Sequence, residues 1–275
     1  MYIDLHTHTT CSDGTLTPEA LVQHAQTCGL QAVAITDHDT VAGNQPAIEE
    51  GITSSCEVVP GVELSATAEG TLHILGLFVD SHNPSLREAT QFLQKNRKTR
   101  NLSILSRLSE QGIIIDREPF IQNAYLGRPH IARALMDQGI VGSIDEAFQH
   151  FLKKGESAYV ERVKLSPQNT LHVIRQAGGV SILAHPITLS HPEEVLIQLL
   201  SCGLQGIEVY YPSHSPQDTE YFLHLAETYE LLVTGGSDFH GSHKPHIELG
   251  CMQVPASLLE PVRKAHQALK QTSPQ

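Results

Sequence analysis

The sequence predicts an α/β fold, and three observations support this. Short β-branched apolar runs alternate with helix-like segments along most of the 275 residues. Histidine and carboxylate side chains stand at the carboxyl ends of these runs or just beyond, where (β/α) barrels carry their catalytic groups. The alternation stops between about residues 84 and 160, where the pattern becomes helical. We therefore predict a parallel sheet with right-handed crossovers and a mostly helical insertion.

Seven segments have the composition of short buried strands. They are residues 2–6, 32–36, 57–62, 73–79, 180–184, 206–210 and 231–235. This number fits a barrel better than an open sheet, although the sequence leaves the closure of the sheet undecided.

Helices are predicted between most of these strands. In the first, Thr17 is the N-cap, Pro18 occupies the first helical position and Gly29 ends the helix. Ser166-Pro167 begins a second helix in the same way, and His191-Pro192 precedes a third.

The break in the rhythm predicts two domains. Residues 1–83 and 161–275 would form the barrel, and residues 84–160 a helical insert over the barrel mouth. Within the insert we expect a long amphipathic helix over 86–111 and shorter helices over 113–125, 131–138 and 144–151. Weak strand signals occur only at 113–115 and 159–160. The polar tail, 270–275, is expected to fray.

Composition excludes several classes of protein. The formal net charge of −12 argues against broad non-specific binding to nucleic acid, although residues 95–100 form a compact basic run. No apolar run is long enough to span a membrane, and the N-terminus lacks a secretory pattern. The five cysteines include no CxxC pair, so neither a disulfide framework nor a thiolate zinc site is indicated. We expect a cytoplasmic protein.

Histidines and carboxylates recur in a pattern that indicates metal binding. His6 and His8, like Asp238 and His240, are two residues apart and would face the same side of an extended chain. Imidazole together with carboxylate suits Zn, Mn or Fe. The candidate ligands are His6, His8, Asp13, His38, Glu63, His73, His185, Asp238 and His240. These are enough for two or three ions, and such multi-metal sites commonly catalyse hydrolysis. Asp37 and Asp39 alternate with His38, so we expect them to act as caps or to support the ligands.

The order and spacing of these motifs resemble the PHP (polymerase and histidinol phosphatase) domain family. The resemblance rests on H-x-H at 6–8, D-H at 37–38, Glu63 with His73, H-P at 185–186 and D-x-H at 238–240. It extends from residue 2 to about residue 250. The segments DLHTHTTCSDGTLTP, AITDHDT, GVELS and GRPHIARAL look like one branch, the nucleoside 3′,5′-bisphosphate phosphatases, also called RNase AM.

The resemblance implies a fold, a cofactor and an activity. The fold would be a distorted (β/α)7 barrel holding three divalent metal ions on all nine candidate residues, with Glu63 bridging two of them. Manganese is the first expectation, and iron, zinc or magnesium are alternatives. The enzyme would be a phosphoric ester hydrolase that removes the 3′-phosphate of nucleoside 3′,5′-bisphosphates and degrades short 5′-phosphorylated RNA from its 5′ end. No obligate protein partner is evident.

Three arginines and a histidine in the insert are candidates for binding substrate. Arg97 and Arg100 share one face of the long predicted helix, and Arg128 and His130 stand in a turn that enters another. A guanidinium group matches phosphate oxygens, so these arginines could hold a second phosphate that is not cleaved. The alternatives are surface salt bridges for the arginines and a packing or capping role for His130.

Other functions share parts of the pattern. A histidinol-phosphate phosphatase would use the same metal chemistry. An amidohydrolase also begins with His-x-His, but commonly needs a lysine at a middle strand end, where this sequence has none. A non-catalytic PHP module typically loses ligands, whereas all nine positions are kept here.

Overall fold

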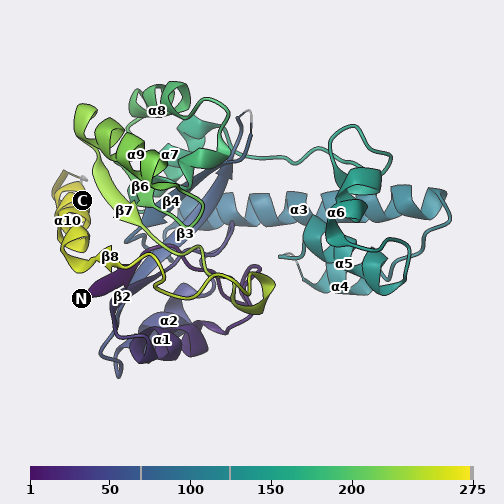
Figure 1. Cartoon of the computed structure of the whole chain (residues 1–275), viewed down its shortest axis with the longest axis horizontal. Coiled ribbons are helices and arrows are strands. Elements are labelled where there is room, and N and C mark those ends of the chain that lie inside the picture. The colour runs from purple at the N-terminus through teal and green to yellow at the C-terminus, as the bar shows by residue number, and fades with distance from the viewer. Residues whose placement is uncertain (69, 124, 273–275) are drawn as a thin grey trace. The chain divides into compact units, whose positions relative to one another are not determined.

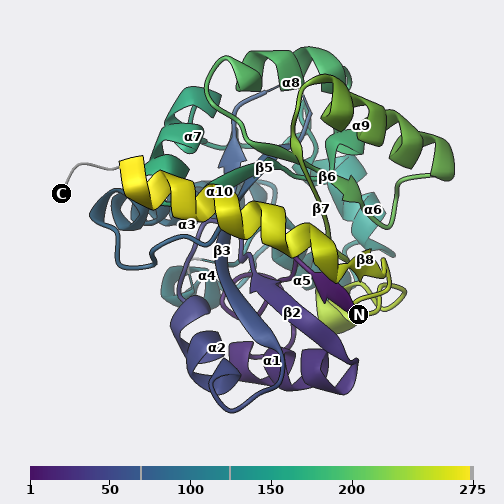
Figure 2. The same ribbon diagram turned by 90° about the vertical axis from the view of Figure 1, so that its left-hand side faces the viewer.

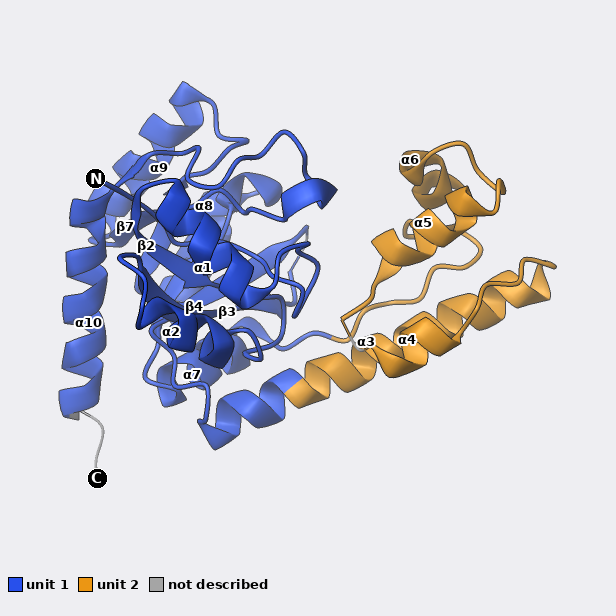
Figure 3. Cartoon of the chain, turned by 90° about the horizontal axis from the view of Figure 1, so that it is seen from below, with its two compact units in different colours: residues 1–90, 164–275 blue, residues 91–163 orange. Residues whose placement is uncertain are grey.

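The computed structural model describes residues 1–68, 70–123 and 125–272, which form two compact units (Figure 3). Unit 1 comprises Met1–Thr90 and Lys164–Gln275, and unit 2 comprises Gln91–Val163. Helix α3 (Pro84–Glu110) begins in unit 1 and continues into unit 2. None of the described helices has both the length and the apolar character needed to cross a membrane.

Unit 1 is built on one eight-stranded sheet in the order β7-β6-β5-β4-β3-β2-β1-β8. The strands are β1 (Tyr2–Asp4), β2 (Leu30–Ile35), β3 (Glu57–Ala66), β4 (Leu72–Leu77), β5 (Val180–Leu183), β6 (Gly206–Tyr210), β7 (Leu232–Gly235) and β8 (Val254–Pro255). The chain after β1 runs beside the chain after β7, because Leu5 N donates to Gly235 O at 3.1 Å and His8 N donates to Phe239 O at 2.9 Å. The sheet is therefore nearly closed, and the predicted α/β barrel is confirmed.

The predicted parallel arrangement is wrong at β4. This strand is antiparallel to both β3 and β5, and the two-residue β8 is antiparallel to β1. Only five residues separate β3 from β4, too few for the helical crossover that a parallel pair requires. As a result, β4 starts at the end of the barrel where β3 and β5 finish. His73, the second residue of β4, thus reaches the same end as side chains that follow the other strands.

Helices cover the outside of the barrel (Figure 1). Helices α1 (Pro18–Thr27) and α2 (Asn44–Gly51) pack beside β2 and β3, and α7 (Pro167–Gln176), α8 (Pro192–Leu200) and α9 (Pro216–Thr228) flank the other half. The predicted N-caps are present: Thr17 accepts from Ala20 N and Ser166 from Asn169 N, both at 3.2 Å. These caps satisfy backbone donors that the first turn of a helix leaves free.

Helix α10 (Leu259–Thr272) lies across the end of the barrel where the parallel strands begin (Figure 2). Its Arg263 pairs with Glu57, the first residue of β3, at 2.7 Å, and its His266 Nδ1 lies 2.7 Å from Gly178 O just before β5. Leu259 and Val262 join the core cluster inside the barrel. This end is thus sealed by apolar packing, and the opposite end carries the polar side chains described below. Residues 270–272, part of the predicted frayed tail, belong to this helix, and 273–275 lie outside the described residues.

Unit 2 is helical in the part that the structure describes. Besides α3 it contains α4 (Glu118–Gln122), α5 (Arg128–Asp137), α6 (Ile144–Ala147) and the π-helix Phe148–Leu152. Residues 113–115 and 159–160, where strand signals were weak, run as coil, because the described part of this unit has no strand for them to pair with. Ile115 instead packs into a helical core with Ile104 and Leu135.

Candidate metal centre

The two histidines of the first motif lie on an extended segment just after β1. Thr7 between them forms a parallel bridge with Phe239, and Thr36 N donates to Thr7 O at 3.0 Å, so the segment lies between its two neighbours. Alternation along the extended chain places His6 and His8 on the same side. Both side chains are fully buried.

Glu63 lies at the centre of the cluster. Its Oε1 is 2.8 Å from His73 Nδ1 and 2.9 Å from His185 Nε2. Its Oε2 is 2.7 Å from His38 Nδ1, 3.3 Å from His8 Nε2 and 3.5 Å from His6 Nε2. One fully buried carboxylate therefore contacts five imidazoles that come from the ends of four strands.

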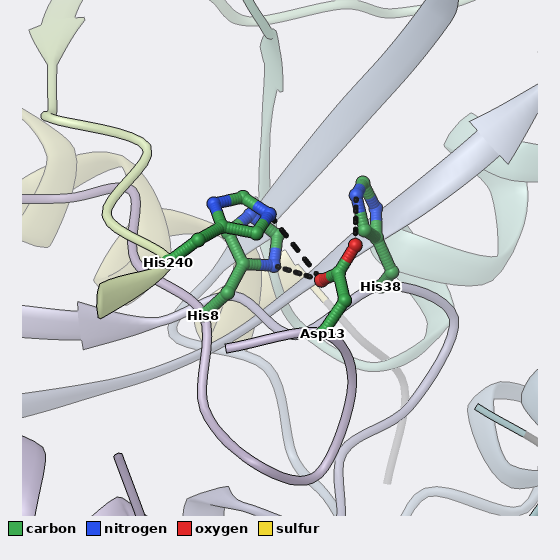
Figure 4. Close-up of side chains that lie close together, drawn as sticks. All are labelled: His8, Asp13, His38 and His240. Atoms are coloured by element: carbon green, nitrogen blue, oxygen red, sulfur yellow. Dashed lines mark ion pairs between the residues drawn. The ribbon is translucent and has the colours of Figure 1, made fainter. Parts of the chain in front are cut away.

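Two aspartates complete the cluster on either side. Asp13 directs Oδ1 toward His240 Nε2 at 3.3 Å and His8 Nδ1 at 3.7 Å, and Oδ2 toward His38 Nε2 at 3.8 Å (Figure 4). Asp238 Oδ1 lies 3.1 Å from His8 Nε2. All nine residues predicted as ligands are thus brought together at one end of unit 1, in four overlapping groups of three or four donors.

The protonation of the cluster favours metal binding. Burial, with the neighbouring His240 and His38, lowers the pKa of His8 to about 3, and burial lowers the pKa of His73 to about 4. Burial alone would raise the pKa of Glu63, but the nearby His38, His73 and His6 hold that pKa well below its usual range. At neutral pH these side chains therefore offer neutral imidazoles and a carboxylate, the forms that bind metals.

Unsatisfied buried atoms test whether metal ions fit this site. Buried polar atoms are nearly always hydrogen-bonded in native proteins. Here four buried ligand atoms have no hydrogen-bond partner: His6 Nε2, His8 Nε2, Asp13 Oδ1 and Glu63 Oε2. They belong to different donor groups of the cluster, and divalent cations in these groups would satisfy them. The donor set thus fits the metals that its chemistry predicts.

Two further aspartates hold the loops that carry ligands, in agreement with the expected role of Asp37 and Asp39. Asp37 accepts from Thr9 N at 2.7 Å and from Ser12 Oγ at 2.6 Å, which fixes the loop that bears Asp13. Asp39 accepts from Ser65 N at 3.0 Å and so ties the segment after β2 to β3.

Sequence reasoning missed other polar residues around the cluster. Glu208 on β6 is fully buried and contacts both His6 and His185. Tyr211 Oη donates to Asp238 Oδ2 at 3.0 Å, and Lys244 Nζ lies 2.7 Å from the same oxygen. One signal was available for Glu208, because an acidic residue inside the apolar strand Gly-Ile-Glu-Val-Tyr needs a buried partner.

The four predicted substrate-binding residues belong to unit 2, whereas the nine cluster residues belong to unit 1. Arg100 is buried and donates from Nε to Val160 O at 2.8 Å, and Arg128 donates from Nη1 to Leu152 O at 2.9 Å. Arg97 lies 3.4 Å from Tyr125 O. His130 Nδ1 accepts from Gly127 N at 3.1 Å, which is the capping contact considered for it at the start of α5.

A nearly closed α/β barrel with clustered imidazoles and carboxylates at one end is typical of metal-dependent hydrolases. The model of the PHP domain family matches residues 4–173, and the chain therefore belongs to that family. A solved structure from Bifidobacterium adolescentis, assigned as a metal-dependent phosphoesterase, superposes with a TM-score of 0.85 at 31% identity and covers 96% of both chains.

Curated relatives cover nearly the whole chain. The 5′-3′ exoribonuclease Rnm of Escherichia coli is 35% identical over 90% of this chain and 87% of its own length. The phosphoribosyl 1,2-cyclic phosphate 1,2-diphosphodiesterase of Eggerthella lenta is 33% identical over 90% of this chain and 98% of its own. The 3′,5′-nucleoside bisphosphate phosphatase of Chromobacterium violaceum is 31% identical over 86% of this chain and 87% of its own length. These relatives place the chain among the PHP phosphoesterases.

Proposed function

We propose that this protein removes the 3′-phosphate of nucleoside 3′,5′-bisphosphates and degrades short 5′-phosphorylated RNA from its 5′ end. The observation that carries the proposal is the buried Glu63 carboxylate in contact with five imidazoles, inside a group of nine potential ligands. Of the relatives that match most of the chain, one is named a 5′-3′ exoribonuclease and another a 3′,5′-nucleoside bisphosphate phosphatase.

The nine residues would hold up to three divalent ions, with manganese as the first choice and iron, zinc or magnesium as alternatives. When bound, such ions supply Lewis-acid activation of water and neutralise charge on a phosphate ester. Glu63 would be shared between the group with His6 and His185 and the group with His38 and His73. Asp13, whose side chain is 29% exposed, is the most accessible carboxylate of the cluster and would meet the substrate side.

An arginine cluster in unit 2 supports a substrate with a second phosphate. Burial, together with the nearby cations Arg128, Arg162 and Arg97, lowers the pKa of Arg100 to about 10. In the described residues neither Arg100 nor Arg128 pairs with a carboxylate, and Arg128 also stacks over the ring of Phe148 at 5.4 Å. Clustered guanidinium groups held by carbonyls and aromatic rings form a natural phosphate site. We therefore propose that Arg97, Arg100 and Arg128, with His130 beside them, bind the phosphate that is not cleaved.

The distribution of charge favours a polyanionic substrate in spite of the acidic total. Unit 2 contains 11 Lys and Arg against 8 Asp and Glu, whereas unit 1 contains 7 against 22. A basic unit attached to an acidic barrel would attract phosphates to one part of the molecule. The basic area is small, which favours a nucleotide or short RNA over a long structured RNA.

A cyclic phosphate diester is the second candidate substrate. The Eggerthella lenta relative, a cyclic phosphate diphosphodiesterase, covers this chain as fully as the exoribonuclease does. Hydrolysis of a cyclic diester would use the same cluster, and in a phosphoribosyl cyclic phosphate the second phosphate, outside the ring that opens, could bind the arginines. Histidinol phosphate, which has one phosphate and a cationic side chain, fits the arginine cluster less well.

Phosphate release by the full-length, manganese-loaded protein tests the proposal. Release from adenosine 3′,5′-bisphosphate, AMP and histidinol phosphate would be compared side by side. Because cleavage of a diester frees no inorganic phosphate, chromatography would follow ring opening of a ribosyl cyclic phosphate and the mononucleotides released from 5′-phosphorylated and 5′-hydroxyl oligoribonucleotides. We expect the bisphosphate to be preferred over AMP and to yield AMP. Equal or faster release from histidinol phosphate would contradict the proposal.

Arg128→Ala tests the arginine cluster. We expect the variant to lose most of the preference for bisphosphate over monophosphate, by about 10-fold or more, because one charge-assisted hydrogen bond contributes about 1.5–3 kcal/mol. Arg133→Ala is the matched control, since Arg133 lies in the same helix and pairs with Asp137 on the surface. An unchanged substrate preference in Arg128→Ala would remove the arginines from the proposal.

A further inference from the structure

Glu208 is a buried carboxylate outside the nine-residue cluster. It lies on β6, is fully buried, and uses both oxygens: Oε1 is 2.9 Å from His6 Nδ1 and Oε2 accepts from His185 N at 2.7 Å. A buried charge is costly unless it is paired or hydrogen-bonded. Both partners of Glu208 are potential metal ligands, 179 positions apart in the chain. We propose that Glu208 is a positioning residue that fixes the ligand geometry of His6 and His185.

The contact with His6 determines which ring nitrogen can bind a metal. A carboxylate only accepts hydrogen bonds, so Nδ1 of His6 must carry the proton that points to Glu208. In the neutral ring the lone pair is then on Nε2, which lies 3.5 Å from Glu63 Oε2 and 3.7 Å from Asp238 Oδ1. His6 Nε2 is one of the buried atoms without a hydrogen-bond partner. Glu208 thus selects the tautomer that directs a free lone pair into the cluster.

The contact with His185 holds an unusual backbone conformation. His185 has φ 28° and ψ 62°, a region that residues other than glycine rarely adopt, and Pro186 follows it. Such a conformation persists only when surrounding contacts enforce it. The charge-assisted hydrogen bond from His185 N to Glu208 provides one such contact. In this conformation His185 Nε2 reaches Glu63 Oε1 at 2.9 Å.

The two contacts of Glu208 link the segment after β1 to the segment after β5, which lie on either side of the place where the sheet closes. His6 follows β1, His185 follows β5, and β6 carries Glu208 beside β5. His6, Glu63 and His185 form one of the potential three-donor groups. One carboxylate therefore sets two of the three donors in that group, so its removal should affect this group more than the group with Asp13 and His240.

Glu208→Gln is the informative substitution because it preserves size. The variant side chain has one acceptor and one donor, so it cannot accept from both His6 Nδ1 and His185 N. If its amide donates to His6, the ring proton must move to Nε2 and the lone pair leaves the cluster. If its oxygen faces His6, two donors face each other at His185. Either arrangement impairs one ligand.

The experiment measures zinc binding and histidine tautomers in the full chain. Metal-free wild type, Glu208→Gln and the control Glu57→Gln would be titrated with Zn²⁺ against a competing chelator. Glu57 is the matched glutamate, because it pairs with Arg263 at the sealed end of the barrel. We expect the affinity of at least one zinc ion to fall about 10–100-fold in Glu208→Gln and to stay unchanged in Glu57→Gln. Equal affinities in all three proteins would overturn the proposal.

A tautomer measurement separates positioning from simple structural support. In ¹⁵N-histidine spectra of the metal-free wild type, recorded at a pH high enough for the His6 ring to be neutral and with His6 assigned by comparison with His6→Asn, we expect a proton on Nδ1 and none on Nε2. A neutral wild-type His6 ring protonated on Nε2 would refute the proposal even if Glu208→Gln failed to fold. The role of Glu208 rests on the proposed metal centre, but different results of the zinc titration would contradict each of them. Wild type that binds no zinc would contradict the metal centre, whereas wild type and variant that bind equally would contradict only the role of Glu208.

Discussion

Replacement of Glu63 by glutamine should disable the metal centre more than any other single change of similar size. Glu63 belongs to two of the four donor groups, with His6 and His185 and with His38 and His73. Without the carboxylate each of these groups keeps two imidazoles, fewer than the three protein ligands that such metals usually need. The group of His8, Asp13, His38 and His240 keeps its four donors.

The expected loss can be given a magnitude. Loss of a partner that only supports a ligand weakens metal binding by about 10–100-fold, so loss of a shared charged ligand should cost at least about 100-fold, or about 2.8 kcal/mol. Elemental analysis after manganese loading and gel filtration would count bound ions, and phosphate release would follow activity. We expect Glu63→Gln to retain fewer ions per chain and Glu57→Gln, from the same strand, to match wild type. An unchanged ion count and affinity in Glu63→Gln would refute this account of the site.

Two other predictions concern the protein without metal and the loop that carries Asp13. Since the pKa of buried His8 is about 3 and that of His73 about 4, the unfolded chain binds more protons than the folded one below pH 6.5. The free energy of unfolding of the metal-free protein should therefore fall between pH 6.5 and pH 5, by about 2 kcal/mol for each of these two histidines at pH 5. The pKa of His6 is raised in the folded protein, so the stabilisation from protonated His6 is already complete below pH 6.5 and does not oppose this loss. Denaturant unfolding at several pH values would measure it, and a flat profile would contradict it. Asp37→Asn should release the loop that Asp37 holds through Thr9 and Ser12, and so weaken metal binding about 10-fold. Competition with a chelator would measure the affinity, and a wild-type value would show that Asp37 does not position the loop that carries Asp13.

The sequence allowed the proximity of the nine cluster residues to be predicted because each stands out from its surroundings. A histidine or acidic residue at the end of an apolar strand is conspicuous, and parallel strands finish at one end of a barrel. The direction of β4 was not predicted from its apolar pattern, because that pattern is the same in either direction. The five-residue connection before β4 was the usable signal, and it explains how His73 joins the cluster from the start of its strand.

Contacts between distant segments were beyond the reach of local patterns. Glu208 meets His6 across 202 positions, and nothing near either residue in the sequence indicates the partner. The arginines of unit 2 were predicted from their fit to phosphate, but the carbonyls that hold them lie in other segments: Val160 is 60 positions from Arg100 and Leu152 is 24 from Arg128. Charge and spacing predict what such a side chain can bind, whereas tertiary packing decides how it is held.

The buried carboxylates that are not potential ligands explain how the cluster can be set before any metal binds. Asp4 accepts from Ser237 N at 2.9 Å, Asp37 from Thr9 N at 2.7 Å, Asp39 from Ser65 N at 3.0 Å and Glu208 from His185 N at 2.7 Å. The first three of these bonds each join a segment that carries one potential ligand to a segment that carries another, and Glu208 joins two such segments by also contacting His6. Because the protein itself fixes the donors, an incoming ion would find a nearly complete array and would need little rearrangement of the chain. The choice among manganese, iron, zinc and magnesium would then depend on the donor atoms and on the metals available to the cell.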